Sequence, residues 1–198
     1  MPRENPGDGR NIGALIVAGG KSTRMGKDKA SLPYGDGNFA LILAETLSGY
    51  GELLLSRANE TQDDFGLRAV YDIYPDCGPI GGLHAALASC ESEALLAVSC
   101  DTPMFEAGFG GLLCSRLESG YDAVVAVDGD RIHPLCAVYR KNTAPVFERC
   151  IKRGDYRLLS VLEELSVRFL DIGETGYSGD CLRNINRPEE YRRLADES

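Results

Sequence analysis

Four cations and a glycine pair lie close together near the N-terminus, directly after an apolar run. The segment "VAGGKSTRMGKDK" covers residues 17–29, and its charged residues are Lys21, Arg24, Lys27, Asp28 and Lys29. A segment of net charge +3, four cations less one acid, within a chain of net charge -9 indicates a polyanionic ligand such as a triphosphate. The alternative is a tight turn followed by a solvated basic face.

The glycine pair fits neither of the common phosphate-binding patterns. A P-loop needs a further glycine five residues before Gly20, where this chain has Leu15, and a dinucleotide fingerprint needs one sooner than Gly26. Gly19 and Gly20 still leave backbone N–H groups open to close approach by a ligand. We therefore expect a nucleotide loop of another kind.

A second candidate is Asp101 in "SCDTP", which follows an apolar run. Pro103 disfavours a helix that starts on Asp101 itself. A carboxylate at the same sheet edge as a phosphate loop is well placed to hold Mg²⁺, which takes one or two carboxylates together with phosphate oxygens. The other interpretation is an aspartate that caps the following helix.

The segment "YDIYPDCGPIGGLHAAL" is a third candidate. Asp72 again comes at the end of an apolar run, and the turn Gly78-Pro79-Ile80 leads into a helix whose free N–H groups suit an anionic or polar group. The segment is also compatible with an ordinary connection from a strand to a helix.

Asn184 and Asn186 in "RNINRPEEY" would point the same way if the chain is extended, and could read the edge of a heterocycle. An Asx turn before a helix that Pro188 opens would explain them equally well. Of the two histidines, His84 has no expected role, and His133 could touch substrate or be structural.

Composition excludes several classes of protein. The chain has 198 residues, 43% of them hydrophobic and 26% charged, as expected of a globular protein near the size of one domain. A net charge of -9 argues against nucleic-acid and anionic-membrane partners.

Seven scattered cysteines without a C-x-x-C pair indicate reduced thiols, several of them in the core. The N-terminus has no signal-peptide pattern, so we expect a cytoplasmic protein.

Apolar runs alternate with helical patterns along most of the chain. Strands are expected at 13–17, 52–56, 67–71, 94–100, 122–127, 131–140 and 166–172, and helices at 39–51, 81–91, 107–120, 142–154, 156–165 and 187–197. This alternation predicts an α/β, doubly wound, Rossmann-like sheet that is mostly parallel, with helices on both faces. The looser pattern after residue 128 predicts a small, partly antiparallel C-terminal lobe.

Domain boundaries are few. Residues 1–11 are polar and rich in glycine and proline, so we expect a disordered tail. Residues 12–198 would then form a single domain, with a nucleotide-binding half at about 12–105 and an acceptor-binding half at about 106–198.

The segment "LIVAGGKSTRMGKDKASL" resembles the signature of nucleotidyltransferases that build dinucleotide forms of the molybdenum cofactor. "YDIYPDCGPIGGLHAAL", "SCDTP", "HPLCAVY", "GDYRLLSVL" and "NINRPEEY" extend the likeness over most of the chain after residue 11. The resemblance is to the molybdenum cofactor guanylyltransferase family. It implies a nucleotide-diphospho-sugar transferase-like fold and transfer of GMP from Mg-GTP to the terminal phosphate of molybdopterin, free or carrying molybdenum.

The resemblance also implies roles for individual residues. Lys29, Arg24 and Asp101 would be catalytic, and Asp101 would hold Mg²⁺. The nucleotide-binding set would be Val17, Ala18, Gly19, Gly20, Lys29, Asn59, Asp72 and Asp101. The acceptor-binding set would be Arg24, Gly78, Pro79, Ile80, Asn184 and Asn186. An apparent extra residue in "LLLSRANE" leaves open whether Asn59 is the family's asparagine.

The sequence leaves alternative functions open. A cytidylyltransferase or sugar-phosphate nucleotidyltransferase could use the same loop. Sugar enzymes usually resemble a pattern with proline before the lysine, where this chain has Asp28, and "AGG" in place of "AAG" favours guanine. The alternative that is not an enzyme is a non-catalytic nucleotide-binding protein. The expected partners are GTP and molybdopterin, with transient contacts to other cofactor-synthesis proteins or recipient molybdoenzymes.

Overall fold

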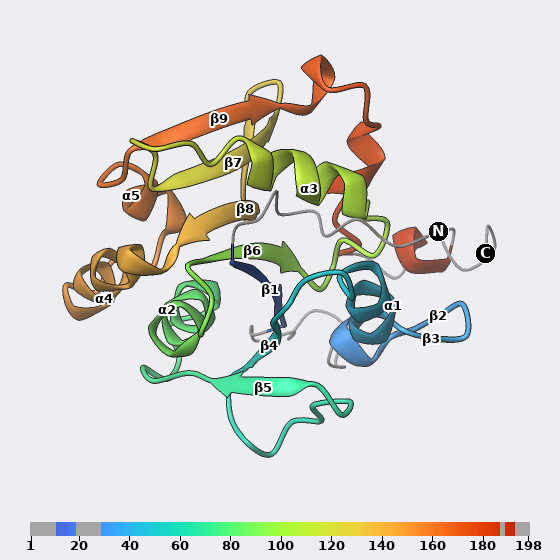
Figure 1. Cartoon of the computed structure of the whole chain (residues 1–198). Helices are drawn as coiled ribbons and strands as arrows, with labels where there is room; N and C mark the ends of the chain where they lie inside the picture. The colour runs from blue at the N-terminus through green and yellow to red at the C-terminus, as the bar shows by residue number, and fades with distance from the viewer. Residues whose placement is uncertain (1–10, 19–28, 187–188, 193–198) are drawn as a thin grey trace.

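A seven-stranded mixed sheet forms the centre of the computed structural model, which describes residues 11–18, 29–186 and 189–192 (Figure 1). The strands follow the order β5-β4-β1-β6-β8-β7-β9. Their bounds are β1 Ile12–Val17, β4 Leu53–Arg57, β5 Arg68–Tyr71, β6 Ala94–Ser99, β7 Ala123–Asp128, β8 Arg131–Arg140 and β9 Val167–Asp171. The predicted α/β class with a mostly parallel sheet is confirmed.

The apolar runs form strands because both of their faces are buried. In β1, Ala14 and Ile16 pack into one core while Leu15 and Val17 pack into the other. A strand that lies between two cores has no solvated face, so its sequence is continuously apolar rather than alternating. β1 consequently lies near the middle of the sheet, between β4 and β6.

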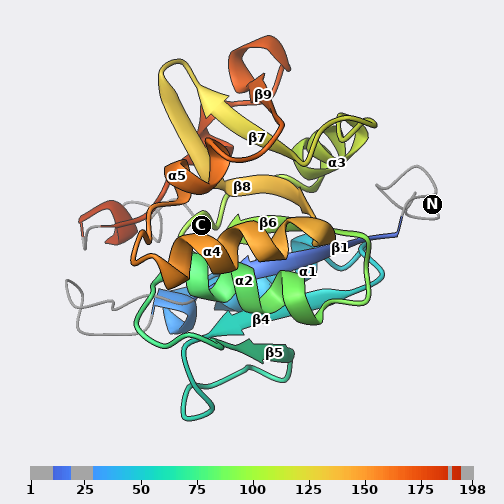
Figure 2. The ribbon, with the colours of Figure 1, turned by 90° about the vertical axis from the view of Figure 1, so that its left-hand side faces the viewer.

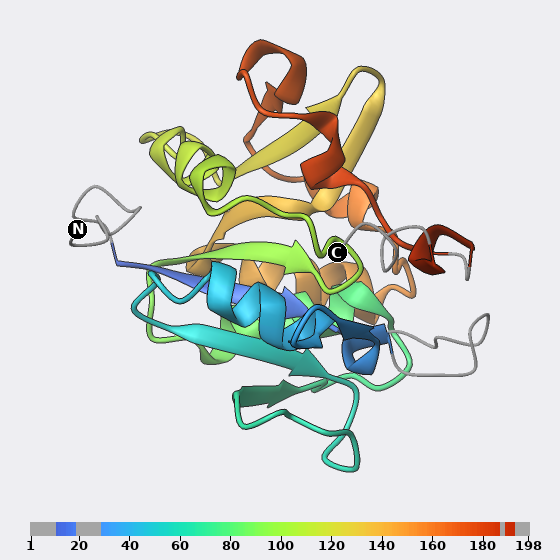
Figure 3. The same ribbon diagram turned by 90° about the vertical axis from the view of Figure 1, so that its right-hand side faces the viewer.

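Helices cover both faces of the sheet. Figure 2 shows α2 and α4 in front of one face, and Figure 3 shows α1 and α3 in front of the other. Their bounds are α1 Phe39–Thr46, α2 Pro79–Ser89, α3 Ala107–Ser115, α4 Ala144–Lys152 and the short α5 Leu158–Leu162. Among the described helices, none has the length and apolar character needed to cross a bilayer.

The antiparallel element predicted for the C-terminal part is β8. It runs antiparallel to both of its neighbours, β6 and β7, whereas β9 pairs parallel to β7. β7, β8 and β9 therefore continue the same sheet as the N-terminal strands. The start of β8 consequently lies at the carboxyl end of β6, because the two strands run in opposite directions.

Several element ends differ from the sequence expectations. α2 begins at Pro79 rather than residue 81, because proline has no N–H to lose and suits the first helical position. A small antiparallel hairpin of β2, Pro33–Tyr34, and β3, Gly37–Asn38, was not expected, although Gly35 adopts the positive φ that its tight turn needs.

Short 3-10 helices complete the described chain: η1 Lys29–Ser31, η2 Lys141–Thr143, η3 Ile172–Glu174 and η4 Gly179–Leu182. Residues 189–192 are helical, and the rest of the expected last helix, 187–197, lies outside the described residues. All seven cysteines are buried thiols outside any disulfide, in line with the expected reduced state.

Candidate active site at the carboxyl ends of the central strands

Asp101 lies just beyond the carboxyl end of β6, beside the end of β1. The N–H of Cys100 donates to the carbonyl of Val17 at 3.0 Å, which joins the two strand ends. The backbone carbonyl of Asp101 accepts from Ile185 N–H at 2.7 Å, and its Oδ1 accepts from the Ser99 hydroxyl at 2.6 Å. Backbone and side chain are therefore both held, which fixes the direction of the carboxylate.

Lys29 and Asp101 form an ion pair at this edge. Lys29 Nζ lies 3.0 Å from Asp101 Oδ2, and the two side chains are 18% and 13% exposed. The same ammonium donates to the side-chain oxygen of Asn186. The fold thus brings Lys29 into contact with Asp101, which is 72 positions later in the sequence, and with Asn186, which is 157 positions later.

The Asp101 carboxylate has the chemistry to hold a hard divalent cation. One of its oxygens accepts from a neutral hydroxyl and the other faces an exchangeable ammonium. Within the described part of the chain, no group of three histidine, cysteine, aspartate or glutamate residues could hold a metal. Such a site suits Mg²⁺ that arrives with phosphate oxygens better than a metal held in an all-protein cage.

Asp72 follows β5 and lies against the first turn of α2. A Cβ placed on Gly82 would lie 2.1 Å from the Ser56 hydroxyl and 3.6 Å from Asp72 Oδ1. Both oxygens are buried and have no hydrogen-bond partner among the described residues. Burial raises the pKa of Asp72 to about 6, because the charged carboxylate loses solvation.

The three residues of the turn that leads into α2, Gly78, Pro79 and Ile80, differ in backbone conformation and burial. Gly78 is the N-cap, with φ 71° and ψ -152°, and Pro79 is the first helical residue. Ile80 is fully buried in the core with Leu83, so a ligand could meet it only through its backbone. Val17 and Ala18 lie at the end of β1, and both side chains are buried.

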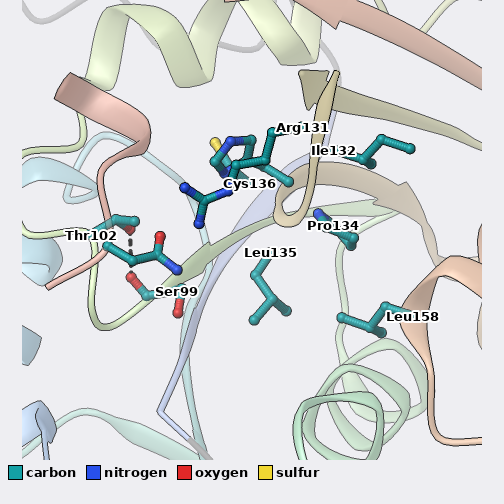
Figure 4. Close-up of a pocket in the computed structure, with 10 residues that line it drawn as sticks. Ser99, Thr102, Arg131, Ile132, Pro134, Leu135, Cys136 and Leu158 are labelled. Atoms are coloured by element: carbon teal, nitrogen blue, oxygen red, sulfur yellow. Dashed lines mark hydrogen bonds between the residues drawn. The ribbon is translucent and has the colours of Figure 1, made fainter. Parts of the chain in front are cut away.

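A cavity of about 170 Å³ lies next to the chain segment that carries Asp101. Its lining includes Ser99 and Thr102, which flank Asp101 in sequence, and Asn184. Figure 4 shows Ser99 and Thr102 at one side of it and the apolar Ile132 and Leu158 at the other. The cavity therefore has a polar wall next to the carboxylate and an apolar wall opposite.

Asn59 is the predicted nucleotide-binding residue that takes part in a local turn. Asn59 lies exposed in the connection from β4 to β5, where its side chain accepts from the backbone N–H of Thr61 at 3.0 Å. This is a local Asx turn, and its contact with a nucleotide stays a prediction. Gly19, Gly20 and Arg24 lie outside the described residues.

Sequence reasoning missed the residues that support the site. Ser99 was overlooked, although its spacing two positions before Asp101 was a usable signal. Thr102 lies in the "SCDTP" motif and Arg131 begins β8, and both line the cavity without having been expected there. Their participation depends on how β8 lies against β6, which spacing alone does not reveal.

Comparisons with known proteins decide the family. The model of the MobA-like NTP transferase domain matches residues 14–169. The chain belongs to this family. Its expected class, a nucleotidyltransferase enzyme linked to molybdenum cofactor biosynthesis, is confirmed at this level.

Two curated relatives agree with the family model. Molybdenum cofactor guanylyltransferase of Vibrio campbellii is 31% identical over 186 residues, which cover 91% of this chain and 93% of the relative. The protein of the same name from Vibrio parahaemolyticus is 32% identical over 185 residues, with the same coverage of 91% and 93%. The likeness extends over almost the full length of both chains.

Solved structures show the same fold. Molybdopterin-guanine dinucleotide biosynthesis protein A from Archaeoglobus fulgidus superposes with a TM-score of 0.82 at 22% identity, over 93% of this chain and 97% of its own. The 2-C-methyl-D-erythritol 4-phosphate cytidylyltransferase from Thermus thermophilus reaches 0.67 at 11% identity, over 92% and 96%. Nucleotidyltransferases with different named reactions therefore share this architecture.

Proposed function

We propose that this member of the MobA-like family transfers GMP from Mg-GTP to the terminal phosphate of molybdopterin, free or carrying molybdenum. The observation that carries the proposal is the cluster of Lys29, Asp101 and Asn186 at the carboxyl ends of β1 and β6. It brings a cation suited to phosphate, a carboxylate suited to a divalent metal ion and an amide from the C-terminal segment to one point. The relatives named as guanylyltransferases support the choice of reaction.

The proposed nucleotide side begins at the end of β1. The backbone of Val17, Ala18, Gly19 and Gly20 would approach guanine and phosphates. Asp72 supports this assignment, because its buried Oδ1 has no partner among the described residues and a bound nucleotide would supply a donor. Residues from about 12–105 would form this nucleotide half, and Asn59 would join it.

The proposed acceptor side is formed mainly by the C-terminal half, about 106–198. Asn184 lines the cavity and Asn186 accepts from Lys29, so the segment between them spans the boundary between the two sides. Arg24 and the turn Gly78-Pro79-Ile80 would add contacts to the acceptor.

The reaction itself requires alignment and charge neutralisation. An oxygen of the acceptor phosphate attacks the α-phosphorus of GTP, a new P–O bond forms, and the bond to the β-phosphate breaks to release pyrophosphate. The acceptor oxygen carries no proton that must be removed, so no general base is required.

Charge on the protein offsets the repulsion between the two anions. Lys29 would exchange its contact with Asp101 for the triphosphate, and Arg24 would approach the acceptor phosphate. Asp101 would hold Mg²⁺, which supplies positive charge to the phosphates. Ser99 keeps the Asp101 carboxylate aimed through its hydrogen bond of 2.6 Å.

Selectivity among nucleotides tests the reaction directly. The protein is incubated with molybdopterin, Mg²⁺ and GTP, CTP, ATP or UTP in turn, and pyrophosphate release is measured. We expect GTP to give the highest rate. Equal or faster release with CTP would move the protein to a cytidylyltransferase, and no release with any nucleotide would favour a non-catalytic nucleotide-binding protein.

Asp101→Asn tests the metal site. The substitution keeps the shape of the side chain and removes the charge, so we expect turnover to fall by about two orders of magnitude or more without recovery at raised Mg²⁺. Circular dichroism should show an unchanged fold. Normal Mg²⁺ activation of this variant would remove Asp101 from the proposed site.

Asn184→Ala and Asn186→Ala test the acceptor side. Both should raise the KM for molybdopterin and leave the Kd for GTP largely unchanged. A lower melting temperature with unchanged KM would show that the two asparagines serve only the local turn.

We further propose that the protein acts in the cytoplasm and meets other cofactor-synthesis proteins or recipient molybdoenzymes transiently.

A further inference from the structure

The cavity beside Asp101 exists because β8 departs from regular pairing. On β7, Val125 pairs with Ala137 and the next residue, Ala126, pairs with His133. The three residues of β8 between those partners, 134–136, therefore have no pairing position on β7. Pro134 lacks an N–H for the ladder, and its carbonyl accepts from the Tyr139 hydroxyl at 2.8 Å, so the bulge is held in place.

Next to this bulge, the side chain of His133 is buried with one ring nitrogen unpaired among the described residues. It lines the cavity and is only 8% exposed. Its Nε2 is buried without a hydrogen-bond partner among the described residues. Because folded proteins pair nearly all of their buried polar atoms, an unpaired one on a cavity wall indicates a ligand that completes the pair.

The surroundings favour the uncharged form of this imidazole. Burial and the positive charge of Arg131 lower the pKa of His133, while Asp128 acts in the opposite direction. A neutral imidazole offers one donor and one acceptor nitrogen, which suits the edge of an uncharged heterocycle. It suits an anionic phosphate less well, because the protonated form is disfavoured here.

The size and lining of the cavity narrow the choice of ligand. Its volume of about 170 Å³ is below the roughly 300–1,000 Å³ of sites that enclose a whole drug-sized molecule, so only a ring system of the ligand fits. The lining combines apolar side chains with hydroxyl and amide groups and the Arg131 guanidinium, which matches a flat ring with a polar edge.

We propose that this cavity binds the fused heterocyclic ring of the acceptor and that His133 recognises its edge by a hydrogen bond, which makes His133 a determinant of acceptor specificity. The inference rests on the proposed function, because it assigns a subsite within the same site. Ser99 and Thr102 on the cavity wall flank Asp101, so a ring bound there lies next to the proposed point of phosphoryl transfer.

Nuclear magnetic resonance of the imidazoles tests binding without catalysis. The chain has two histidines, so spectra of the ¹⁵N-labelled protein contain two imidazole spin systems, and His84→Phe assigns them. We expect added molybdopterin, without GTP, to shift the Nε2 resonance of His133 and to leave His84 unchanged. An unchanged His133 resonance at saturating molybdopterin would overturn the proposal.

Kinetics separates recognition from packing. His133→Phe should raise the KM for molybdopterin about tenfold, the factor carried by one net hydrogen bond, with a smaller change in kcat and none in the Kd for GTP. His133→Gln, which keeps a hydrogen-bonding group, should recover part of the loss. His84→Phe is the matched control, because His84 is also buried with an unpaired ring nitrogen but does not line this cavity.

The outcomes distinguish this inference from the proposed function. If the wild type releases pyrophosphate but His133→Phe keeps a normal KM, the ring lies elsewhere and the transferase assignment stands. If the wild type releases none, the proposed function fails, and the imidazole spectra alone decide whether the cavity takes the acceptor ring. Variants that fail to fold leave the wild-type spectra as the deciding measurement.

Discussion

Asp72→Asn should make the protein more stable at pH 8 while weakening its proposed contact with the nucleotide. Asp72 has a pKa of about 6 in the folded chain against an ordinary value of 3.8, because burial disfavours the charged carboxylate. The folded state therefore holds the proton more tightly than the unfolded state. Stability falls as pH rises from about 3.8 to about 6, and the full cost persists above that range.

The size of the effect follows from the shift and from solvation. A difference of about 2 pKa units at about 1.4 kcal/mol per unit gives an upper bound of about 3 kcal/mol. Asp72 is only half-buried, and its carboxyl lies 3.4 Å from the position of a Cβ on Gly81 in the first turn of α2. Solvent screening and the positive end of this helix offset part of the cost, so we expect a gain of about 1 kcal/mol.

Urea denaturation at pH 8 and pH 4 measures this gain. At pH 8 the variant should be about 1 kcal/mol more stable, equivalent to about 3 °C in melting temperature, and at pH 4 the difference should largely disappear. Asp130→Asn, on the exposed turn between β7 and β8, is the control and should change stability little. A variant less stable than the wild type at pH 8, or a difference equal at both pH values, would refute the reasoning.

Two further pairs of variants, each a test substitution and its control, probe the site. Gly82→Ala places a Cβ 2.1 Å from the Ser56 hydroxyl, so we expect a loss of about 1–3 kcal/mol in the free energy of unfolding, whereas Gly51→Ala, with open space around it, should change stability little. Equal losses in both variants would contradict the close approach. Lys29→Met should lower kcat about a hundredfold, or about 3 kcal/mol of transition-state stabilisation, with a small effect on GTP affinity. Lys27→Met should mainly cause a salt-dependent change in GTP affinity, and the division of roles fails if the two variants behave alike in steady-state assays.

The strands and helices were largely predictable because their signals are local. The strand expected at 94–100 is continuously apolar up to Val98, and it forms β6, Ala94–Ser99, because both faces of this strand are buried. The C-terminal ends of the helices were less predictable, because the last turn of a helix often tightens or frays. α3, for example, ends at Ser115, whereas the sequence pattern predicted a helix that continues to residue 120. α2 starts at Pro79, which follows the preference of proline for the first position of a helix.

The sequence by itself determined the chemistry that the chain carries. A cationic glycine loop, an aspartate after an apolar run and an amide pair near the C-terminus were recognisable from residue types and spacing. Their meeting was decided by the tertiary structure, because Lys29 contacts Asn186 across 157 positions of sequence and no local pattern encodes such a distance. The cavity is likewise a product of pairing, since β8 inserts antiparallel between β6 and β7 and bulges at Pro134. Sequence spacing reports which groups a strand end presents, whereas only strand order and register decide which strand ends lie side by side.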